Sequence, residues 1–364
     1  MYRRTFARVD LGAYAANVGA VRRMMGPDVK LLAVVKASAY GHGLLPVARA
    51  AEKAGADWLG VAITEEGEFL REAGIRLPIL VLAPVNAAGA LAAVRCGLTL
   101  SVFTPDHIQA LQAAAIASGL EARAHVKLDT GMNRVGVKTE QELVALLEAA
   151  NPARGVKITG AFTHFADGGN PDTRFNDGQL ARFGDMLTLL PPGLLIHAAA
   201  SATLPRPEAR FDMVRAGISL FGYLSVAYSE AIRPVLTWEA EITHVKDIGT
   251  GEAVGYGVTY RAKRPVKVAT IAVGYGDGYS RSLSGKGQVL VNGRRCPIIG
   301  RLCMDQMMVD VSGAGPVYTG DNAVLLGQQG EEHILADEIA GWMGTISYEV
   351  LLAISQRVPR IYVE

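Results

Sequence analysis

Short apolar runs rich in β-branched residues alternate with alanine-rich segments along residues 30–222. The runs have the length of buried strands, and the segments between them carry apolar residues at helical spacing. This pattern predicts eight strands, over residues 30–36, 58–63, 78–83, 98–103, 122–128, 157–165, 194–199 and 212–221. Among the helices it predicts between them are those over residues 64–73, 105–118, 139–150 and 177–189.

Two of the predicted helices begin with a capping signal. Thr64 is followed by Glu66 and Gly67, and Thr104 stands directly before Pro105; hydroxyl side chains favour the N-cap and proline the first helical position. Strands separated by helices pair in parallel through right-handed crossovers. Eight such units favour a closed (β/α)₈ barrel of the TIM type. An open doubly wound sheet is the alternative, because a strand count from pattern alone is easily wrong by one.

The pattern changes after about residue 235. Short strands joined by glycine-rich turns are predicted over residues 238–245, 266–273, 288–291, 307–311 and 323–326, with one late helix over residues 335–355. The pair Asn292-Gly293 predicts a tight hairpin. We therefore expect a boundary near residues 230–237, with a barrel domain over 1–235 and a mainly-β domain over 236–364. Within this division, the first strand region of the chain can pair with the mainly-β domain and not with the barrel.

Composition excludes several classes of protein. With 50% hydrophobic residues, 20% charged residues and a formal charge of +1, the chain has the balance of a globular enzyme and no global field that would attract nucleic acid. Cys96, Cys296 and Cys303 lack C-x-x-C spacing, so neither a disulfide framework nor a zinc site is expected. No apolar run reaches the ~18 residues of a membrane span, and no apolar signal core is found at the start, so a cytoplasmic protein is expected.

Five histidines show no shared ligand spacing, and no metal site is predicted from them: His107, His125, His197, His244 and His333. Other polar residues gather where the predicted barrel strands end. They are Lys36, Lys127 with Arg134 just beyond it, His164, Ser201, and Arg215 followed by Gly217. Barrel enzymes carry their active sites at the carboxyl ends of the strands. The pattern therefore predicts that these side chains converge at one end of the barrel.

Lys36 ends a nearly all-apolar strand, and two interpretations of it are open. A lysine at a barrel rim can extend its amine to solvent, and spacing alone favours this modestly. A desolvated lysine can instead form a Schiff base, because burial promotes loss of its proton near neutral pH. The residues that follow it, Ala-Ser-Ala-Tyr-Gly-His-Gly, reverse the preference.

The segment 35–43, Val-Lys-Ala-Ser-Ala-Tyr-Gly-His-Gly, resembles the cofactor-lysine signature of alanine racemases. Further blocks match the same family in order and spacing: Lys-Leu-Asp-Thr-Gly-Met-Asn-Arg-Val-Gly over 127–136, Thr-His-Phe-Ala over 163–166, Arg-Ala-Gly-Ile over 215–218, Gly-Tyr-Gly over 255–257, Gly-Tyr-Gly-Asp-Gly over 274–278, Gly-Arg-Leu-Cys-Met-Asp over 300–305, Tyr-Glu-Val over 348–350 and Arg-Val-Pro-Arg over 357–360. Two positions depart from the pattern. Ser38 and Ala200 stand where family members more often have asparagine.

The resemblance implies a fold-type III pyridoxal-phosphate enzyme that interconverts L- and D-alanine with two bases. Lys36 would hold the cofactor and act on one face of the substrate, and Tyr256 would act on the other. A free tyrosine has a pKa near ~10, so Tyr256 must be acidified to act at neutral pH. His164 is implied as its hydrogen-bond partner. Arg215 would bond the pyridine nitrogen and, because it stays protonated, would leave that nitrogen without a proton.

The resemblance also implies further binding roles. The phosphate would be held by Ser201, the amides of Gly217 and Ile218, and the hydroxyls of Tyr40 and Tyr348. Arg134 would lie near the cofactor and the substrate carboxylate, oriented by a carbamylated Lys127. The remaining substrate contacts are assigned to Met304, Tyr275 and Asp305.

A homodimer follows from the same resemblance, with the tyrosine-bearing domain of one subunit completing the site of the other. The implied biological role is the supply of D-alanine for peptidoglycan, and no membrane or nucleic-acid partner is implied. A broad-specificity serine/alanine racemase remains open as an alternative. A non-catalytic pyridoxal-phosphate carrier, a basic-amino-acid decarboxylase and a binding module without cofactor are weaker alternatives. The carrier proteins lack a second domain, and the order of the Tyr256 and Met304 blocks favours a racemase over a decarboxylase.

Overall fold

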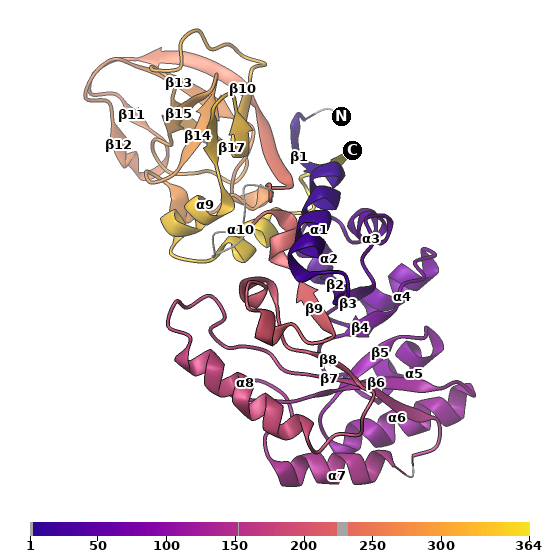
Figure 1. Cartoon of the computed structure of the whole chain (residues 1–364). Helices are drawn as coiled ribbons and strands as arrows, with labels where there is room; N and C mark the ends of the chain where they lie inside the picture. Colours follow the sequence, from indigo (N-terminus) through magenta and orange to yellow (C-terminus); the bar gives the residue numbers. More distant parts are fainter. Residues whose placement is uncertain (1–2, 152, 224–231) are drawn as a thin grey trace. The chain divides into compact units, whose positions relative to one another are not determined.

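The chain forms two compact units in the computed structural model, which describes residues 3–151, 153–223 and 232–364 (Figure 1). One unit comprises Tyr14–Ala39 and Leu44–Ile232, and the other comprises Met1–Ala13, Tyr40–Gly43 and Arg233–Glu364. The part of the expected boundary that precedes residue 232 lies outside the described residues.

Eight parallel strands form the sheet of the first unit, in the order β8-β7-β6-β5-β4-β3-β2-β9. They are β2 (Lys30–Val34), β3 (Trp58–Val61), β4 (Ile79–Val81), β5 (Thr99–Val102), β6 (Ala122–Lys127), β7 (Val156–Phe162), β8 (Leu195–His197) and β9 (Met213–Ala216). A parallel bridge between Ala200 and Arg215 connects the two ends of the sheet. The eight predicted strands and the closed barrel are confirmed, and the open sheet is wrong.

Helices and short 3-10 turns alternate with these strands (Figure 1). They are α1 (Leu11–Met25), α2 (Lys36–Tyr40), α3 (Leu44–Lys53), α4 (Thr64–Glu72), α5 (Ala87–Arg95), α6 (Pro105–Ser118), α7 (Glu140–Ala150), α8 (Arg174–Leu187), η1 (Ser201–Thr203), η2 (Pro207–Ala209) and η3 (Ile218–Phe221). The Thr104 cap is confirmed, since its hydroxyl accepts from the His107 amide at 3.4 Å. The Thr64 cap is wrong: α4 already begins at Thr64, and Ile63 occupies the cap position without a side-chain bond. No helix in the described part of the chain is long and apolar enough to cross a membrane.

Burial explains why the barrel strands are continuous apolar runs. Every residue of β4, β5 and β9 is buried, because helices cover one face and the barrel interior the other. The last predicted strand is shorter than expected, since β9 ends at Ala216 and the chain turns at Gly217 into η3.

The second unit is built on a nine-stranded sheet whose main path is β15-β14-β17-β10-β1-β19. Its strands are β1 (Thr5–Asp10), β10 (Leu236–Ile248), β13 (Val266–Ile271), β14 (Gln288–Val291), β15 (Arg294–Pro297), β16 (Met307–Asp310), β17 (Asn322–Gln329), β18 (Glu332–Ile334) and β19 (Arg360–Val363); β11 (Ala253–Val254) and β12 (Tyr260–Arg261) pair separately. The N-terminal strand β1 lies between β10, to which it is antiparallel, and β19, to which it is parallel.

Turns and helices of this unit test two further predictions. The Asn292-Gly293 hairpin is confirmed: both residues have positive φ, 49° and 69°, and β14 pairs with β15 in antiparallel register. The single late helix is wrong, because Gly344 adopts a left-handed conformation (φ 74°) that ends one helix before the next begins. The elements are α9 (Ala336–Met343), α10 (Ser347–Ala353), η4 (Tyr256–Val258), η5 (Tyr275–Asp277) and η6 (Arg281–Leu283).

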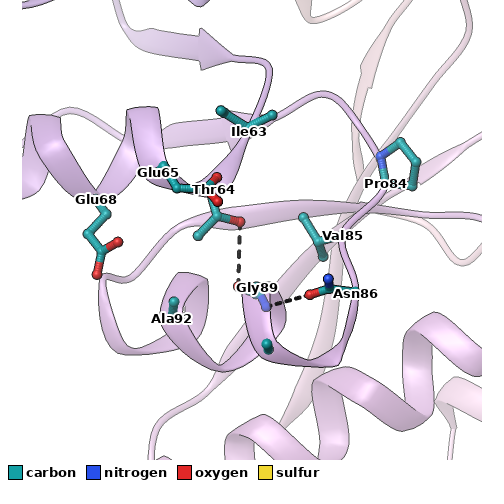
Figure 2. Close-up of a pocket in the computed structure, with 10 residues that line it drawn as sticks. Ile63, Thr64, Glu65, Glu68, Pro84, Val85, Asn86, Gly89 and Ala92 are labelled. Atoms are coloured by element: carbon teal, nitrogen blue, oxygen red, sulfur yellow. Dashed lines mark hydrogen bonds between the residues drawn. The ribbon is translucent and has the colours of Figure 1, made fainter.

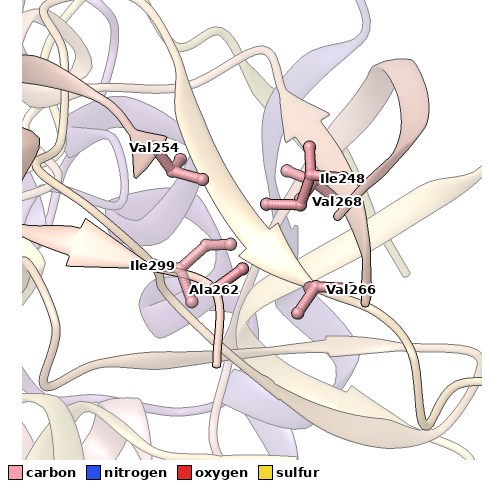
Figure 3. Packing of buried hydrophobic residues seen from close by; sticks show 6 residues of the cluster. All are labelled: Ile248, Val254, Ala262, Val266, Val268 and Ile299. Carbon is pink, nitrogen blue, oxygen red and sulfur yellow. The ribbon is translucent and has the colours of Figure 1, made fainter. Parts of the chain in front are cut away.

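An apolar cluster packs around the long strand β10 and its neighbour β13. Figure 3 shows its six buried side chains, Ile248, Val254, Ala262, Val266, Val268 and Ile299. Val254 belongs to β11, which leads directly into η4. Packing of this kind holds the short 256–258 segment on a rigid support.

Candidate active site

Arg215 is the most deeply buried cation of the barrel and lies at the centre of the candidate site. Its side chain projects from β9, and Nη2 donates to the carbonyls of Thr163 and Ala198, at 2.8 Å each. Nη1 donates to the His197 carbonyl at 3.1 Å and to Nδ1 of the same residue at 2.8 Å. Burial lowers the pKa of Arg215 to about 9, so the group keeps its charge at neutral pH. Among the described residues, Nε–H is the guanidinium donor left for a ligand.

His164 follows β7 and lies beside this guanidinium, with Nδ1 at 3.2 Å from Arg215 Nη2. Burial lowers the pKa of His164 to about 2, reinforced by the positive charges of Arg215, Lys127, Arg134 and Lys36, in that order. The imidazole is therefore neutral throughout the physiological range. All four positive charges lower the pKa of His164, so the structure brings these side chains, which are distant in the sequence, close to the imidazole.

Lys127 ends β6 inside the barrel. Its amine lies 4.8 Å from the centre of the Phe162 ring and 3.4 Å from the Leu128 carbonyl. Burial, Arg215 and Arg134 lower its pKa well below the ordinary value, and Asp129 opposes them. Burial and the neighbouring positive charges thus favour the neutral form of this amine.

Arg134 lies in a loop whose backbone amides donate hydrogen bonds to Asp129. The Asp129 carboxylate accepts from the amides of Gly131, Asn133 and Arg134, at 3.0, 2.9 and 3.1 Å. The loop is joined to the next strand end by Thr130, whose hydroxyl lies 2.8 Å from that of Thr163. These bonds place the Arg134 backbone firmly and leave its guanidinium exposed.

Lys36 leaves the barrel just beyond β2 and is partly buried. Burial and the charge of Arg134 lower the pKa of its amine, while Glu66 raises it. Among the described residues, no carboxylate forms an ion pair with Lys36, Lys127, Arg134 or Arg215. The mouth of the barrel thus carries an excess of positive charge that an anionic ligand would neutralise.

The loops after β8 and β9 meet at Ser201. Its buried hydroxyl accepts from the Gly217 amide at 2.9 Å and lies 2.9 Å from the Ser219 hydroxyl. Ser201 and the backbone of Gly217 and Ile218 are therefore gathered as predicted.

The remaining predicted site residues belong to the second unit. There, Tyr40 and Tyr348 form an aromatic pair with ring centres 5.8 Å apart, and burial raises the pKa of both phenols. Arg360 fixes the turn beyond Tyr40 by donating from Nε to the Gly41 carbonyl at 2.9 Å. The 40–43 segment is thereby attached to this unit.

Tyr256, Tyr275 and Met304 expose 69%, 41% and 53% of their surfaces, which is high for large apolar side chains. The last two are adjacent, because the amides of Tyr275 and Gly276 donate to the carbonyls of Cys303 and Met304, at 3.1 and 2.8 Å. Asp305 is exposed next to them and accepts from Arg357 at 2.7 Å.

Comparison with protein families matches almost the whole chain. The model described as "Alanine racemase, N-terminal domain" covers residues 9–225, and "Alanine racemase, C-terminal domain" covers residues 235–362. This chain belongs to the alanine racemase family. The resemblance carried by the sequence motifs is thereby confirmed.

Individual members of the family are similar over their full length. An alanine racemase of Symbiobacterium thermophilum is 45% identical, over 99% of this chain and 97% of its own. The crystal structure of alanine racemase from Bacillus anthracis with bound L-Ala-P has a TM-score of 0.92 at 36% identity, covering 100% of this chain and 96% of that one. The enzyme from Bartonella henselae, solved with covalently bound pyridoxal phosphate, has a TM-score of 0.90 at 29% identity and covers 99% of each chain.

A pocket of about 440 Å³ lies elsewhere on the barrel rim of this alanine racemase family member, between the starts of α4 and α5. Figure 2 shows Thr64 and Asn86 bonded to the Gly89 backbone, with Glu65 and Glu68 along one wall. None of the predicted site residues lines it. Among the described residues no group of three His, Cys, Asp or Glu side chains could hold a metal ion.

Sequence reasoning missed two histidines of this barrel. His125 and His197 are buried and joined by a 3.0 Å hydrogen bond, and His197 contacts Arg215. A signal was available: His125 precedes Lys127 by two residues on one strand, so both side chains face the barrel interior. Gly160 opposite is required here, because a Cβ at that position would lie 2.7 Å from the His125 ring.

Proposed function

We propose that this protein is a pyridoxal-phosphate-dependent alanine racemase. The observation that carries the proposal is the cluster of Lys36, Lys127, Arg134 and Arg215 around a neutral His164, without a carboxylate partner, in a chain that matches the family from end to end. A lysine of lowered pKa among unneutralised cations suits a ligand with an aldehyde, a phosphate and a carboxylate-bearing substrate.

The residues present fit pyridoxal phosphate. Lys36 supplies an amine whose pKa is lowered, as attack on an aldehyde requires. Ser201 and Ser219 place two hydroxyls at the loops after β8 and β9, where barrel proteins commonly hold phosphate. The Nε–H of Arg215 can donate to a ring nitrogen and cannot give up its proton to it. When bound, the cofactor would supply the electron sink that acidifies the α-hydrogen of an attached amino acid.

Lys36 would move a proton on one face of the substrate α-carbon. Its amine must be neutral to accept that proton, and burial together with Arg134 favours the neutral form. Arg134 would hold the substrate carboxylate, because its exposed guanidinium has no carboxylate partner among the described residues and its backbone is fixed by Asp129.

Tyr256 would serve the opposite face, contributed by the second copy of a homodimer. Support comes from its exposure in η4, which follows the buried Val254 of β11, in a unit that also exposes the side chains of Tyr275 and Met304. Large exposed apolar side chains on a rigid element are typical of an interface. Activity should then depend on protein concentration, because a dissociated subunit lacks one base.

Carbamylation of Lys127 would give Arg134 and Arg215 an anionic partner. Carbon dioxide adds to a neutral amine with release of one proton, which changes the charge at this position from zero to minus one. The lowered pKa of Lys127 favours this addition. The buried group would then orient Arg134 by a charge-assisted hydrogen bond.

We further propose that the enzyme works in the cytoplasm and supplies D-alanine for peptidoglycan, since the relatives named above are bacterial alanine racemases. Broad specificity that includes serine is the alternative activity. The carrier alternative is contradicted by the family match over residues 235–362.

The test begins with the absorbance of the purified protein, followed by borohydride reduction and peptide mapping. A band near ~420 nm and a pyridoxyl label on Lys36 are expected from a Schiff-base lysine. Racemisation of alanine and serine is then measured by isotope exchange at the α-carbon, and a much larger kcat/KM for alanine is expected. A colourless protein that binds no added pyridoxal phosphate contradicts the proposal, and equal rates for both amino acids favour the broad-specificity alternative.

A further inference from the structure

The four residues after Lys36 adopt an unusual backbone conformation. Ala37, Ser38, Ala39 and Tyr40 have φ values of 53°, 54°, 53° and 53°, so the segment drawn as α2 is a left-handed turn. L-residues avoid this region because Cβ approaches the following carbonyl, at about 1–2 kcal/mol for each residue. None of the four is glycine. The surrounding structure must therefore hold the turn in place.

Glu66 supplies part of that support. It lies in the first turn of α4, and its Oε1 accepts from the Ala37 amide at 2.5 Å. Its Oε2 accepts from the Ala62 amide at 2.8 Å, just beyond the end of β3. One carboxylate thus connects the exits of two neighbouring barrel strands. The Ala37 amide belongs to the residue that directly follows the proposed cofactor lysine.

The adjacent acidic residues of α4 do not share this role. Glu65 and Glu68 line the pocket between α4 and α5, and Figure 2 shows them along its wall. Glu66 is not among the residues that line it. The helix therefore offers two matched acidic controls within one turn of Glu66.

Charge around the Lys36 amine supports the same conclusion. Arg134 opposes protonation of the amine, Glu66 favours it, and the Lys36 charge in turn lowers the pKa of His164. Among the described residues, Glu66 is the one carboxylate whose charge raises the pKa of the Lys36 amine. Loss of the Glu66 charge would leave the positive charge of Arg134 unopposed at the Lys36 amine.

We propose that Glu66 is a positioning residue for Lys36: its carboxylate holds the left-handed turn that follows the lysine and thereby fixes where the amine stands at the barrel mouth. The inference rests on the proposed function only in taking Lys36 as the reactive amine. Glu66 itself touches backbone amides and is not a catalytic residue.

The test uses full-length protein and two measurements that need no turnover. Hydrogen–deuterium exchange of the Ala37 amide reports the turn, and competitive acetylation of Lys36 across pH, with bound carbonyl compounds first removed, reports the amine. Glu66→Gln keeps the shape of the side chain but loses the charge and one acceptor. We expect at least tenfold faster exchange at Ala37 and a Lys36 midpoint lower by roughly one pH unit. Glu65→Gln should match the wild type in both.

Glu66→Asp separates the two effects. It keeps the charge but is one methylene short of the two amides, so exchange at Ala37 should stay fast while the Lys36 midpoint returns toward that of the wild type. Thermal unfolding of each variant shows whether the barrel is intact. If Glu66→Gln leaves both Ala37 exchange and the Lys36 midpoint as in Glu65→Gln, the proposal is overturned.

Failure of the proposed function would look different. In that case the wild type takes up no pyridoxal phosphate and shows no label on Lys36, whatever Glu66 does. If instead the wild type is labelled, Glu66→Gln should bind added pyridoxal phosphate more weakly, while Glu65→Gln binds it like the wild type. Equal affinity of the two variants would count against a positioning role.

Discussion

Nδ1 of His197 accepts a hydrogen bond from Nη1 of Arg215 at 2.8 Å inside the barrel. Since arginine can only donate, this nitrogen carries no proton and the His197 proton is on Nε2. That Nε2 lies 3.0 Å from Nδ1 of His125, so it donates there, and the His125 proton is on its own Nε2. Arg215 therefore determines the tautomers of both histidines. The buried His125 Nε2 has no hydrogen-bond partner among the described residues.

Replacement of His197 tests whether this pair holds Arg215 in place. His197→Ala removes the acceptor and leaves a buried guanidinium donor unsatisfied, so the free energy of unfolding should fall by about 1–3 kcal/mol. The kcat for alanine should fall about 10- to 100-fold, because Arg215 loses one of the contacts that orient it. Urea unfolding and steady-state kinetics measure the two effects. The exposed His244→Ala is the control and should change neither. Unchanged kcat in His197→Ala would show that the carbonyl contacts of Arg215 suffice.

Three histidines whose pKa values are lowered by the folded structure should make stability fall in acid. Burial and Arg215 lower the pKa of His125 to about 3, that of His164 is about 2, and that of His197 lies well below normal. Below about pH 6.5 the unfolded chain binds protons that the folded chain refuses, so the free energy of unfolding decreases as pH falls. The limiting slope is about 1.4 kcal/mol per pH unit for each histidine.

Chemical denaturation between pH 7 and 4 measures this slope, and His125→Asn should make it shallower. The ring nitrogen signals of the three histidines should stay those of neutral imidazole over the same range in the folded protein. A charged His164 at pH 5 would contradict the arrangement of cations around it.

Without carbamylation, Lys127 should lower the free energy of unfolding. Its folded pKa is lowered, so between that value and the unfolded value near ~10.4 the unfolded chain binds the extra proton. The free energy of unfolding therefore rises with pH in this window. In buffer depleted of carbon dioxide, Lys127→Met should be at least as stable as the wild type at neutral pH, with a flatter pH dependence.

The same variant should lose activity, because Arg134 loses its partner. Added bicarbonate should raise the activity of the depleted wild type and leave Lys127→Met unchanged. Intact-protein mass measured at mild alkaline pH reports the carbamate directly. A wild type without this mass change, and indifferent to bicarbonate, would show that Lys127 acts as a plain amine.

Tyr256→Phe should separate chemistry from folding. The side chain is 69% exposed, so loss of its hydroxyl should change the free energy of unfolding by less than about 0.5 kcal/mol. Racemisation should drop roughly 100-fold or more, because one face loses its base. Borohydride labelling of Lys36 should be unaffected. Tyr318→Phe, at an equally exposed tyrosine, is the control. Full activity in Tyr256→Phe would assign the second base to another residue.

The sequence pattern predicted the eight strands of the barrel. These strands and the helix at Pro105–Ser118 follow from local hydrophobic periodicity, which depends on residues close together in the chain, although β9 is shorter than predicted. The family blocks also single out Lys36, Arg134 and Arg215 as candidate site residues without a structure. Where a prediction failed, a local alternative prevailed: Ile63 rather than Thr64 became the cap of α4, and Gly344 divided the last helix in two.

Tertiary structure alone decided which side chains meet. The pairing of His125 with His197 depends on strand register, including the shift between β6 and β7 that brings Gly160 opposite His125. The left-handed turn after Lys36 is not encoded by any glycine within it, and a carboxylate from α4 supplies part of its support by accepting from the Ala37 amide. Local propensity acts over a few residues, whereas these contacts join positions brought together by closure of the barrel. For that reason the sequence determined the barrel strands and the motif residues. The folded structure determined which charged groups surround the candidate site.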